Sequence, residues 1–183
     1  MPKTGGNWVS TSLRTLFPKA ERMANIHTTR KSAPRPKLFT FAFVRHPLTW
    51  YQSYFSYKQR KGWDASNDWD DVVRCDSFTG FVETALERTP AYYSKLLRRF
   101  VGRTDDEIDF IGHFESLTND LIRALELAGE EFDAAAIRNT PPVNQSSYDQ
   151  HPAVYPDGLA QRVLEVEAEA VVRFYSVDTS NSG

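Results

Sequence analysis

The run LFTFAFV at residues 38–44 constrains the fold of this chain more than any other stretch of its sequence. A nearly continuous apolar run of this length is typical of a strand that is buried on both faces, as in a parallel sheet. The run ends abruptly at RHP, and Pro47 suits the first turn of a helix over LTWYQSYFSYKQR. A buried strand that passes directly into a helix predicts an α/β fold.

Short apolar runs and amphipathic segments alternate along the rest of the chain. Further strands are expected in MANIHTT, which ends near His27, and in IDFIGHFESL. Helices are expected in NWVSTSLRTLF, SFTGFVETALER, PAYYSKLLRRFVG, TNDLIRALELAG, EEFDAAAIRN and GLAQRVLEVEAEAVVRFY. The first of these has an apolar stripe of Val9, Leu13, Leu16 and Phe17, and Ser77 is placed to cap the second. The segment KGWDASNDWDDVVRCD (61–76) has no clear period and predicts a loop or a short excursion. Because no repeat or linker divides the chain, residues 1–183 are predicted to form one domain, with a mostly parallel central sheet flanked by helices.

Composition and charge exclude several classes of protein. The net charge of −2 argues against a protein that coats nucleic acid, so no nucleic-acid partner is expected. The single cysteine, Cys75, excludes an internal disulfide and a multi-cysteine metal site, and we expect no metal. The sequence contains no run of about 18 apolar residues, so no transmembrane segment is expected. No signal peptide precedes Lys3, so a cytoplasmic location is expected.

Lys3 begins a short loop with the features of an anion site, KTGGNW. Gly5 and Gly6 allow the backbone to turn tightly and to approach an anion closely. The N–H groups of residues 5–8 would point at that anion from a helix N-terminus, and the lysine adds a mobile charge. In G-x-x-x-x-G-K-[ST] the lysine follows the glycines, so an ordinary NTP-binding loop fits poorly. Taken alone, the pattern is better explained by a surface turn with an incidental lysine.

A second anion-binding pattern pairs Arg45 with Ser53. Arg45 directly follows the buried run, and Ser53 lies eight residues later, on the same helix face as the first turn. An arginine fork and a hydroxyl at this spacing could clasp a phosphate through charge-assisted hydrogen bonds. The alternative is an arginine that pairs with a carboxylate and a serine that faces solvent.

Three segments together, PKTGGNW, VRHPLTWYQSYF and GHFESLTNDL, resemble in this order the landmarks of the sulfotransferases that use PAPS (3′-phosphoadenosine 5′-phosphosulfate). The family has a P-K-[ST]-G-[GT]-[TS]-W-like loop for the 5′-phosphosulfate, an arginine and a serine eight apart for the 3′-phosphate, and a later Y-E-D-L-like segment. The resemblance covers residues 2–129 and continues weakly through VNQSS and the terminal helix. It implies a P-loop-NTPase-like three-layer sandwich.

The same resemblance implies an activity and a role for each site residue. The enzyme would transfer the sulfuryl group of PAPS, without a metal, to a hydroxyl or amine of a small-molecule or carbohydrate acceptor. Lys3 would contact the phosphosulfate and stabilise the departing 3′,5′-bisphosphate. The 5′-phosphate would be bound, mainly by backbone, by Thr4, Gly5, Gly6, Asn7 and Trp8. Trp8 would also pack on adenine, Arg45 and Ser53 would hold the 3′-phosphate, and Phe114 stands where many members have an adenine-contacting tyrosine.

Because the acceptor must lose a proton, the reaction calls for a general base, and His27 is the candidate. It lies near the end of the strand expected in MANIHTT, on the same rim as Lys3 and Arg45, and histidine titrates near neutral pH. The alternative is a histidine that only hydrogen-bonds locally. The other three histidines are not candidates: His46, His113 and His151.

Aromatic residues in the first half of the chain suggest an acceptor pocket or a core. Helical spacing favours core packing for Tyr51, Tyr54 and Phe55. Trp63 and Trp69 lie in the aperiodic segment among aspartates, so these two are predicted to face the acceptor.

The beginning of the chain and the loop residue Asn7 depart from the family pattern. Only Met1 and Pro2 precede Lys3, although such a loop normally follows a buried central strand. Either the true start lies upstream or has been trimmed, or the sheet lacks its first strand. A missing strand would expose neighbouring edges and favour association, so a homo-oligomer is one expectation. Asn7 stands where the family usually has threonine or serine.

Two functions stay open beside the sulfotransferase. One is a P-loop small-molecule kinase or other phosphotransferase, although the lysine position and the lack of a clear Mg²⁺-binding aspartate after a strand count against it. The other is a non-catalytic relative that binds the nucleotide without turnover.

Overall fold

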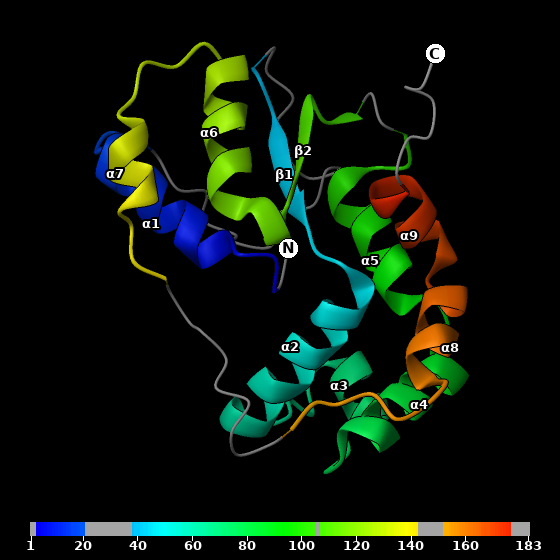
Figure 1. Ribbon diagram of the computed structural model, residues 1–183. Helices are drawn as coiled ribbons and strands as arrows, with labels where there is room; N and C mark the ends of the chain where they lie inside the picture. Colours follow the sequence, from blue (N-terminus) through cyan, green and yellow to red (C-terminus); the bar gives the residue numbers. More distant parts are fainter. Residues whose placement is uncertain (1–2, 21–37, 105–106, 143–151, 177–183) are drawn as a thin grey trace. The chain divides into compact units, whose positions relative to one another are not determined.

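The computed structural model describes residues 3–20, 38–104, 107–142 and 152–176, and the chain divides into two compact units. Unit 1 comprises Met1–Arg45 and Leu97–Gln145, and unit 2 comprises His46–Leu96 and Ser146–Gly183. Figure 1 labels the helices and strands. The sequence predicts one domain over residues 1–183. Helices and a parallel sheet together confirm the α/β class.

Unit 1 contains a two-stranded parallel sheet (Figure 1). Strand β1 (Phe41–Val44) pairs with β2 (Phe110–His113), with Phe41 opposite Phe110. Both strands lie inside the apolar runs that predict them, and their parallel pairing is as expected. The strand expected in MANIHTT lies outside the described residues, and the described strands do not confirm a three-layer sandwich.

Helices α1 (Gly6–Leu16), α6 (Leu117–Leu127) and α7 (Ala134–Arg138) complete unit 1, together with a 3₁₀ turn, η2 (Phe114–Ser116). The core joins apolar side chains from β1 and all three α-helices: Trp8, Val9, Phe43, Leu121, Ile122, Leu125 and Ile137. The apolar stripe predicted for the first helix therefore faces this core.

Close packing of α6 on β2 depends on Gly112. A Cβ at this glycine would lie 2.6 Å from Cε1 of Phe43 and 2.9 Å from the Cβ of Asp120. Both distances are too short for a real side chain, so only glycine lets the helix approach the strand this closely. Gly112 thereby sets how closely the α6 side chains that face β2 approach the sheet.

Unit 2 is built from helices around an aromatic core. Their bounds are α2 Pro47–Lys61, α3 Asp68–Val73, α4 Phe78–Arg88, α8 Leu159–Val166 and α9 Ala168–Tyr175; α5 (Tyr92–Val101) begins in unit 2 and ends in unit 1. Two predicted helix starts are confirmed. Pro47 opens α2, and the Ser77 hydroxyl caps α4 by accepting the N–H of Gly80 at 3.1 Å. Core packing of Tyr51, Tyr54 and Phe55 is confirmed as well.

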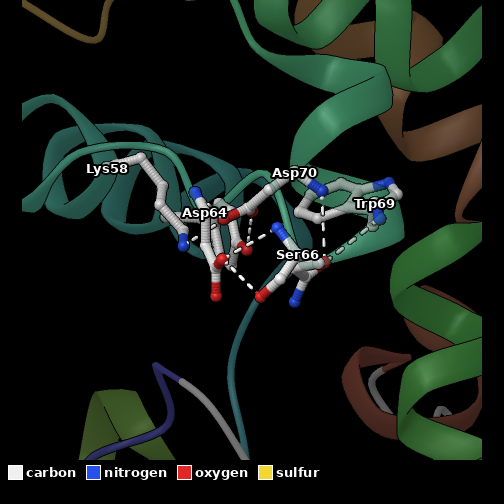
Figure 2. Close-up of polar contacts among 7 residues, drawn as sticks. Lys58, Asp64, Ser66, Trp69 and Asp70 are labelled. Atoms are coloured by element: carbon white, nitrogen blue, oxygen red, sulfur yellow. Dashed lines mark hydrogen bonds and ion pairs between the residues drawn. The ribbon is translucent and has the colours of Figure 1, made fainter.

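A buried aspartate joins α2 to α3 in unit 2, and Figure 2 shows this cluster. Asp70 is fully buried, pairs with Lys58, and accepts hydrogen bonds from the Tyr54 hydroxyl at 2.5 Å and from the Asp64 N–H at 3.0 Å. Burial, together with the bond to Asp70, raises the pKa of Tyr54 well above its ordinary value. The carboxylate thus holds the segment between the two helices against α2.

The prediction of a loop over residues 61–76 is wrong, because α3 forms within it. Asn67 accepts the N–H groups of Trp69 at 3.1 Å and Asp70 at 3.2 Å, so its side chain caps the helix. The helix has six residues, too few for a hydrophobic period to be recognised in the sequence. The acidic residues of its first turn, which look like a loop composition, favour the positive end of the helix dipole.

The prediction of a single terminal helix is also wrong, because the helix is interrupted at Glu167 and forms α8 and α9. Glu167 is fully buried. Its carboxylate accepts the N–H of Tyr93 at 3.1 Å, the N–H of Ser94 at 2.8 Å and the Ser94 hydroxyl at 2.6 Å, which caps the first turn of α5. It also accepts the Tyr51 hydroxyl at 2.8 Å. Burial, and then the negative charge of Glu167, raises the pKa of Tyr51.

We expect Glu167→Gln to lower the free energy of unfolding by about 2–4 kcal/mol. The glutamine amide nitrogen cannot accept a hydrogen bond, so at least one buried donor of α5 or Tyr51 loses its partner. Urea denaturation measures the change as a lower midpoint at an unchanged slope. Glu165→Gln, at an exposed position of α8, is the matched control and should change stability by less than about 0.5 kcal/mol. Equal stability of the two variants would contradict this role of Glu167.

Candidate active site

The candidate site lies in unit 1, where the chain turns from Lys3 into α1. Lys3 has a φ of 65° and Gly5 a φ of 82°, so both have left-handed backbones. For a residue with a Cβ, this conformation costs about 1–2 kcal/mol. A non-glycine residue persists there only where its surroundings hold it, and such strain concentrates at functional sites.

Gly5 is required by its neighbours as well as by its backbone. A Cβ at this position would lie 2.5 Å from Cδ2 of Leu117 and 3.3 Å from Cδ2 of Phe114. The start of α6 and the turn η2 therefore pack directly against the loop. At Gly6, by contrast, a Cβ would meet nothing within 4 Å.

The N-terminus of α1 presents backbone donors at this loop. The first intrahelical bond of the helix runs from the Val9 N–H to the Gly5 carbonyl at 3.1 Å, so the N–H groups of Gly6, Asn7 and Trp8 precede it. The N-cap residue, Gly5, has no side chain to cap the helix, and the first turn has no acidic residue. An anion at this end would be favoured by the donors and by the helix dipole.

Arg45 connects the loop to the carboxyl ends of the two strands. It directly follows β1 and is buried, with 8% of its surface exposed. Its Nη1 donates a hydrogen bond to the Lys3 carbonyl at 3.3 Å, and its Cζ lies 4.0 Å from the centre of the Phe114 ring. The structure therefore brings together Lys3, Gly5, Arg45 and Phe114, at the edge where parallel α/β sheets usually bind ligands.

Asp120 fixes the junction of β2 and η2 from α6. Its Oδ2 accepts the N–H of His113 at 2.6 Å, and Nδ1 of the same histidine lies 3.7 Å from that oxygen. Phe114 is the next residue, so this bond helps set where its ring lies. The sequence reasoning missed both Asp120 and Leu117. A glycine within an otherwise apolar strand, at position 112, was the available signal that α6 would pack closely there.

Three further residues are predicted to belong to the site: Trp8, Ser53 and His27. The Trp8 side chain lies in the core of unit 1, and its Nε1 donates to the Thr140 carbonyl at 3.2 Å. Ser53 belongs to unit 2, so its pairing with Arg45 stays a prediction. It is buried, and within the described ranges its hydroxyl makes no hydrogen bond. His27 lies outside the described residues.

Thr4 and Asn7, also predicted to bind the nucleotide, are buried and exposed, respectively. Trp63 and Trp69 are the two tryptophans predicted to face the acceptor. Trp69 is buried, so the prediction for this residue is wrong. Its ring stacks on Tyr92 with centroids 3.9 Å apart, and its Nε1 donates to the Thr89 hydroxyl at 2.9 Å. Trp63 is half-buried.

No family model, curated protein or solved structure matches this chain. Over the described ranges, no helix has both the length and the apolar character that crossing a membrane requires. In the same ranges, no group of three or more His, Cys, Asp or Glu residues is placed to hold a metal ion. The site is therefore interpreted from its geometry and from the three sequence motifs.

We expect Gly5→Ala to lower the free energy of unfolding by about 1–3 kcal/mol, because alanine opposes the left-handed backbone and its Cβ overlaps Leu117. The matched control is Gly6→Ala, at the first residue of α1, which should be neutral or stabilise by up to about 1 kcal/mol. Urea denaturation of both variants gives the comparison. Equal effects at the two positions would contradict the packing described for this loop.

Proposed function

We propose that unit 1 binds PAPS and that the protein transfers the sulfuryl group of this nucleotide to a hydroxyl or amine of a small-molecule or carbohydrate acceptor. One observation carries the proposal. The hydrogen bond from Arg45 to the Lys3 carbonyl joins the two anion-binding patterns, which lie 42 residues apart in the sequence. A nucleotide with separate anionic groups at its 5′ and 3′ positions suits two adjacent cationic segments.

The Lys3 loop suits the 5′ end of the nucleotide. The Lys3 ammonium would approach the phosphosulfate, while the N–H groups of Gly6, Asn7 and Trp8 would bind the 5′-phosphate. As the sulfuryl group leaves, negative charge grows on the bridging oxygen. Donors and a cation fixed at that position favour the transition state over the ground state. In this proposal they supply the positive charge that Mg²⁺ supplies in phosphoryl transfer.

Arg45 suits the 3′-phosphate. Its guanidinium is planar and always charged, and it binds phosphate oxygens in a fork geometry. Two of its contacts, the Lys3 carbonyl and the Phe114 ring, orient the guanidinium. Because Arg45 is buried, a charge-assisted hydrogen bond there is stronger than one in water. Ser53 would add its hydroxyl, as the family resemblance implies.

We expect Lys3→Ala and Arg45→Ala each to weaken binding of 3′,5′-ADP, the product nucleotide, by about tenfold or more, because each removes a charged contact to phosphate. Isothermal titration calorimetry measures the affinities. Arg45→Lys serves as a milder second variant, since the arginine is buried. Lys19→Ala and Arg14→Ala, at exposed positions of the same unit, are charge-matched controls and should bind as the wild type does.

Titration of the wild type with ATP–Mg²⁺ separates the alternatives. Wild-type affinity for 3′,5′-ADP in both alanine variants would overturn the proposed site. Binding of ATP–Mg²⁺ in place of 3′,5′-ADP would favour the phosphotransferase. Binding of 3′,5′-ADP with no transfer from labelled PAPS to any class of hydroxyl or amine acceptor would favour the non-catalytic relative.

The general base in this proposal is His27, on the basis of the resemblance. We expect His27→Ala to lower turnover by about 10²–10⁴-fold, since the acceptor proton then lacks a positioned base, and to leave 3′,5′-ADP affinity unchanged. Labelled-sulfate transfer and calorimetry on the same preparations give the two readouts. His151→Ala is the control. Unchanged turnover in His27→Ala would remove this histidine from the mechanism.

A further inference from the structure

Phe114 occupies a junction of unit 1 that an adenine contact would not require. One face of its ring lies against the Arg45 guanidinium, with 4.0 Å between Cζ and the ring centre. Its Cδ2 also lies 3.3 Å from where a Cβ on Gly5 would stand. The residue thus touches the arginine and borders the lysine loop, the two cationic segments of the proposed site.

Two contacts on Arg45 restrict its guanidinium in different ways. The Phe114 ring, with its negative face, attracts the cation and holds Cζ over the ring. The Lys3 carbonyl accepts an N–H from Nη1 at 3.3 Å and so restricts rotation of the guanidinium. An arginine oriented before the ligand arrives loses less rotamer freedom when it binds phosphate.

The ring itself is held by its neighbours along the chain. The preceding residue, His113, donates its N–H to Asp120 of α6 at 2.6 Å. One residue earlier, Gly112 allows the close approach of α6 to the strand. Leu117, at the start of α6, fills the space beside Gly5. Phe114 is therefore placed by β2 and α6 together, and it transmits that placement to Arg45.

We propose that Phe114 is a positioning residue, which orients Arg45 toward the 3′-phosphate and so sets the preference of the site for a 3′-phosphorylated nucleotide. This inference rests on the proposed function and changes the role that the resemblance implies for this residue. Arg45 covers one face of the Phe114 ring, so adenine cannot stack on that face. The side chain therefore contributes to recognition of the 3′-phosphate more than to recognition of adenine.

The test compares 3′,5′-ADP with 5′-AMP, which lacks only the 3′-phosphate. In Phe114→Leu, we expect affinity for 3′,5′-ADP to fall about tenfold and affinity for 5′-AMP to stay within about twofold of wild type. In an Arg45→Ala background, Phe114→Leu should have no further effect on 3′,5′-ADP. Calorimetry for the tighter complexes and competition for the weaker ones provide these affinities.

Two further variants are controls, and a third replaces Phe114→Leu if that variant does not fold. Phe114→Tyr retains the ring and should retain the wild-type ratio of the two affinities. Phe110→Leu makes the same substitution at the other end of β2 and should leave that ratio unchanged. If Phe114→Leu unfolds, Phe114→Met keeps the volume without the aromatic face and takes its place, with thermal melting as the check on folding.

The outcomes separate this inference from the proposed function. If the wild type binds 3′,5′-ADP and Phe114→Leu weakens both nucleotides by the same factor, Phe114 contacts adenine and the positioning role is overturned. An unchanged affinity for both nucleotides overturns it as well. If the wild type does not bind 3′,5′-ADP at all, the proposed function fails, and this inference fails with it.

Discussion

The hydrogen bond from Arg45 to the Lys3 carbonyl is the contact on which the interpretation of unit 1 depends. Without it, the left-handed lysine would belong to an ordinary turn, and the arginine would be a buried charge at a strand end. The bond is possible because Gly5 lets the loop lie against Leu117 and Phe114. The candidate site therefore combines three short segments that are far apart in the sequence: the Lys3 loop, Arg45 after β1, and η2 with the start of α6.

Unit 2 depends on a different kind of contact, the buried carboxylate. Asp70 is balanced by Lys58, whereas Glu167 is surrounded by backbone and hydroxyl donors. Burying a carboxylate without such partners would cost several kcal/mol, so each acid specifies which segments must meet around it. Asp70 holds the segment before α3, and Glu167 joins the break between α8 and α9 to the start of α5. These acids explain why a helical unit with an aromatic core has defined ends to its helices.

Features of the fold that depend on local chemistry could be predicted from the sequence, and features that depend on distant partners could not. The apolar run before Arg45, the proline of α2 and the cap Ser77 are local signals, and the elements they predict are present. The break at Glu167 is invisible in a periodic helical sequence, because its cause is a set of donors on α5 and α2. Trp69 was misassigned for the same reason, since its stacking partner follows it by more than twenty residues.

For the site, the charged residues stand out in the sequence itself, whereas Phe114 is singled out only through the family resemblance, and Leu117 is not singled out at all. Lys3 and Arg45 stand out because cations beside glycines or after buried strands suggest anion binding. Leu117 looks like an ordinary helix residue until the loop is seen against it, and the contact of Phe114 with Arg45 is visible only in the structure. Substitution of the arginine would change the charge of the site, whereas substitution of the phenylalanine would change only where that charge points. A ligand with one anionic group can be bound by charge alone, but a ligand with two at a fixed separation also needs the charges to be correctly placed. Under the proposed function, the phenylalanine would therefore matter most for a nucleotide that carries both groups.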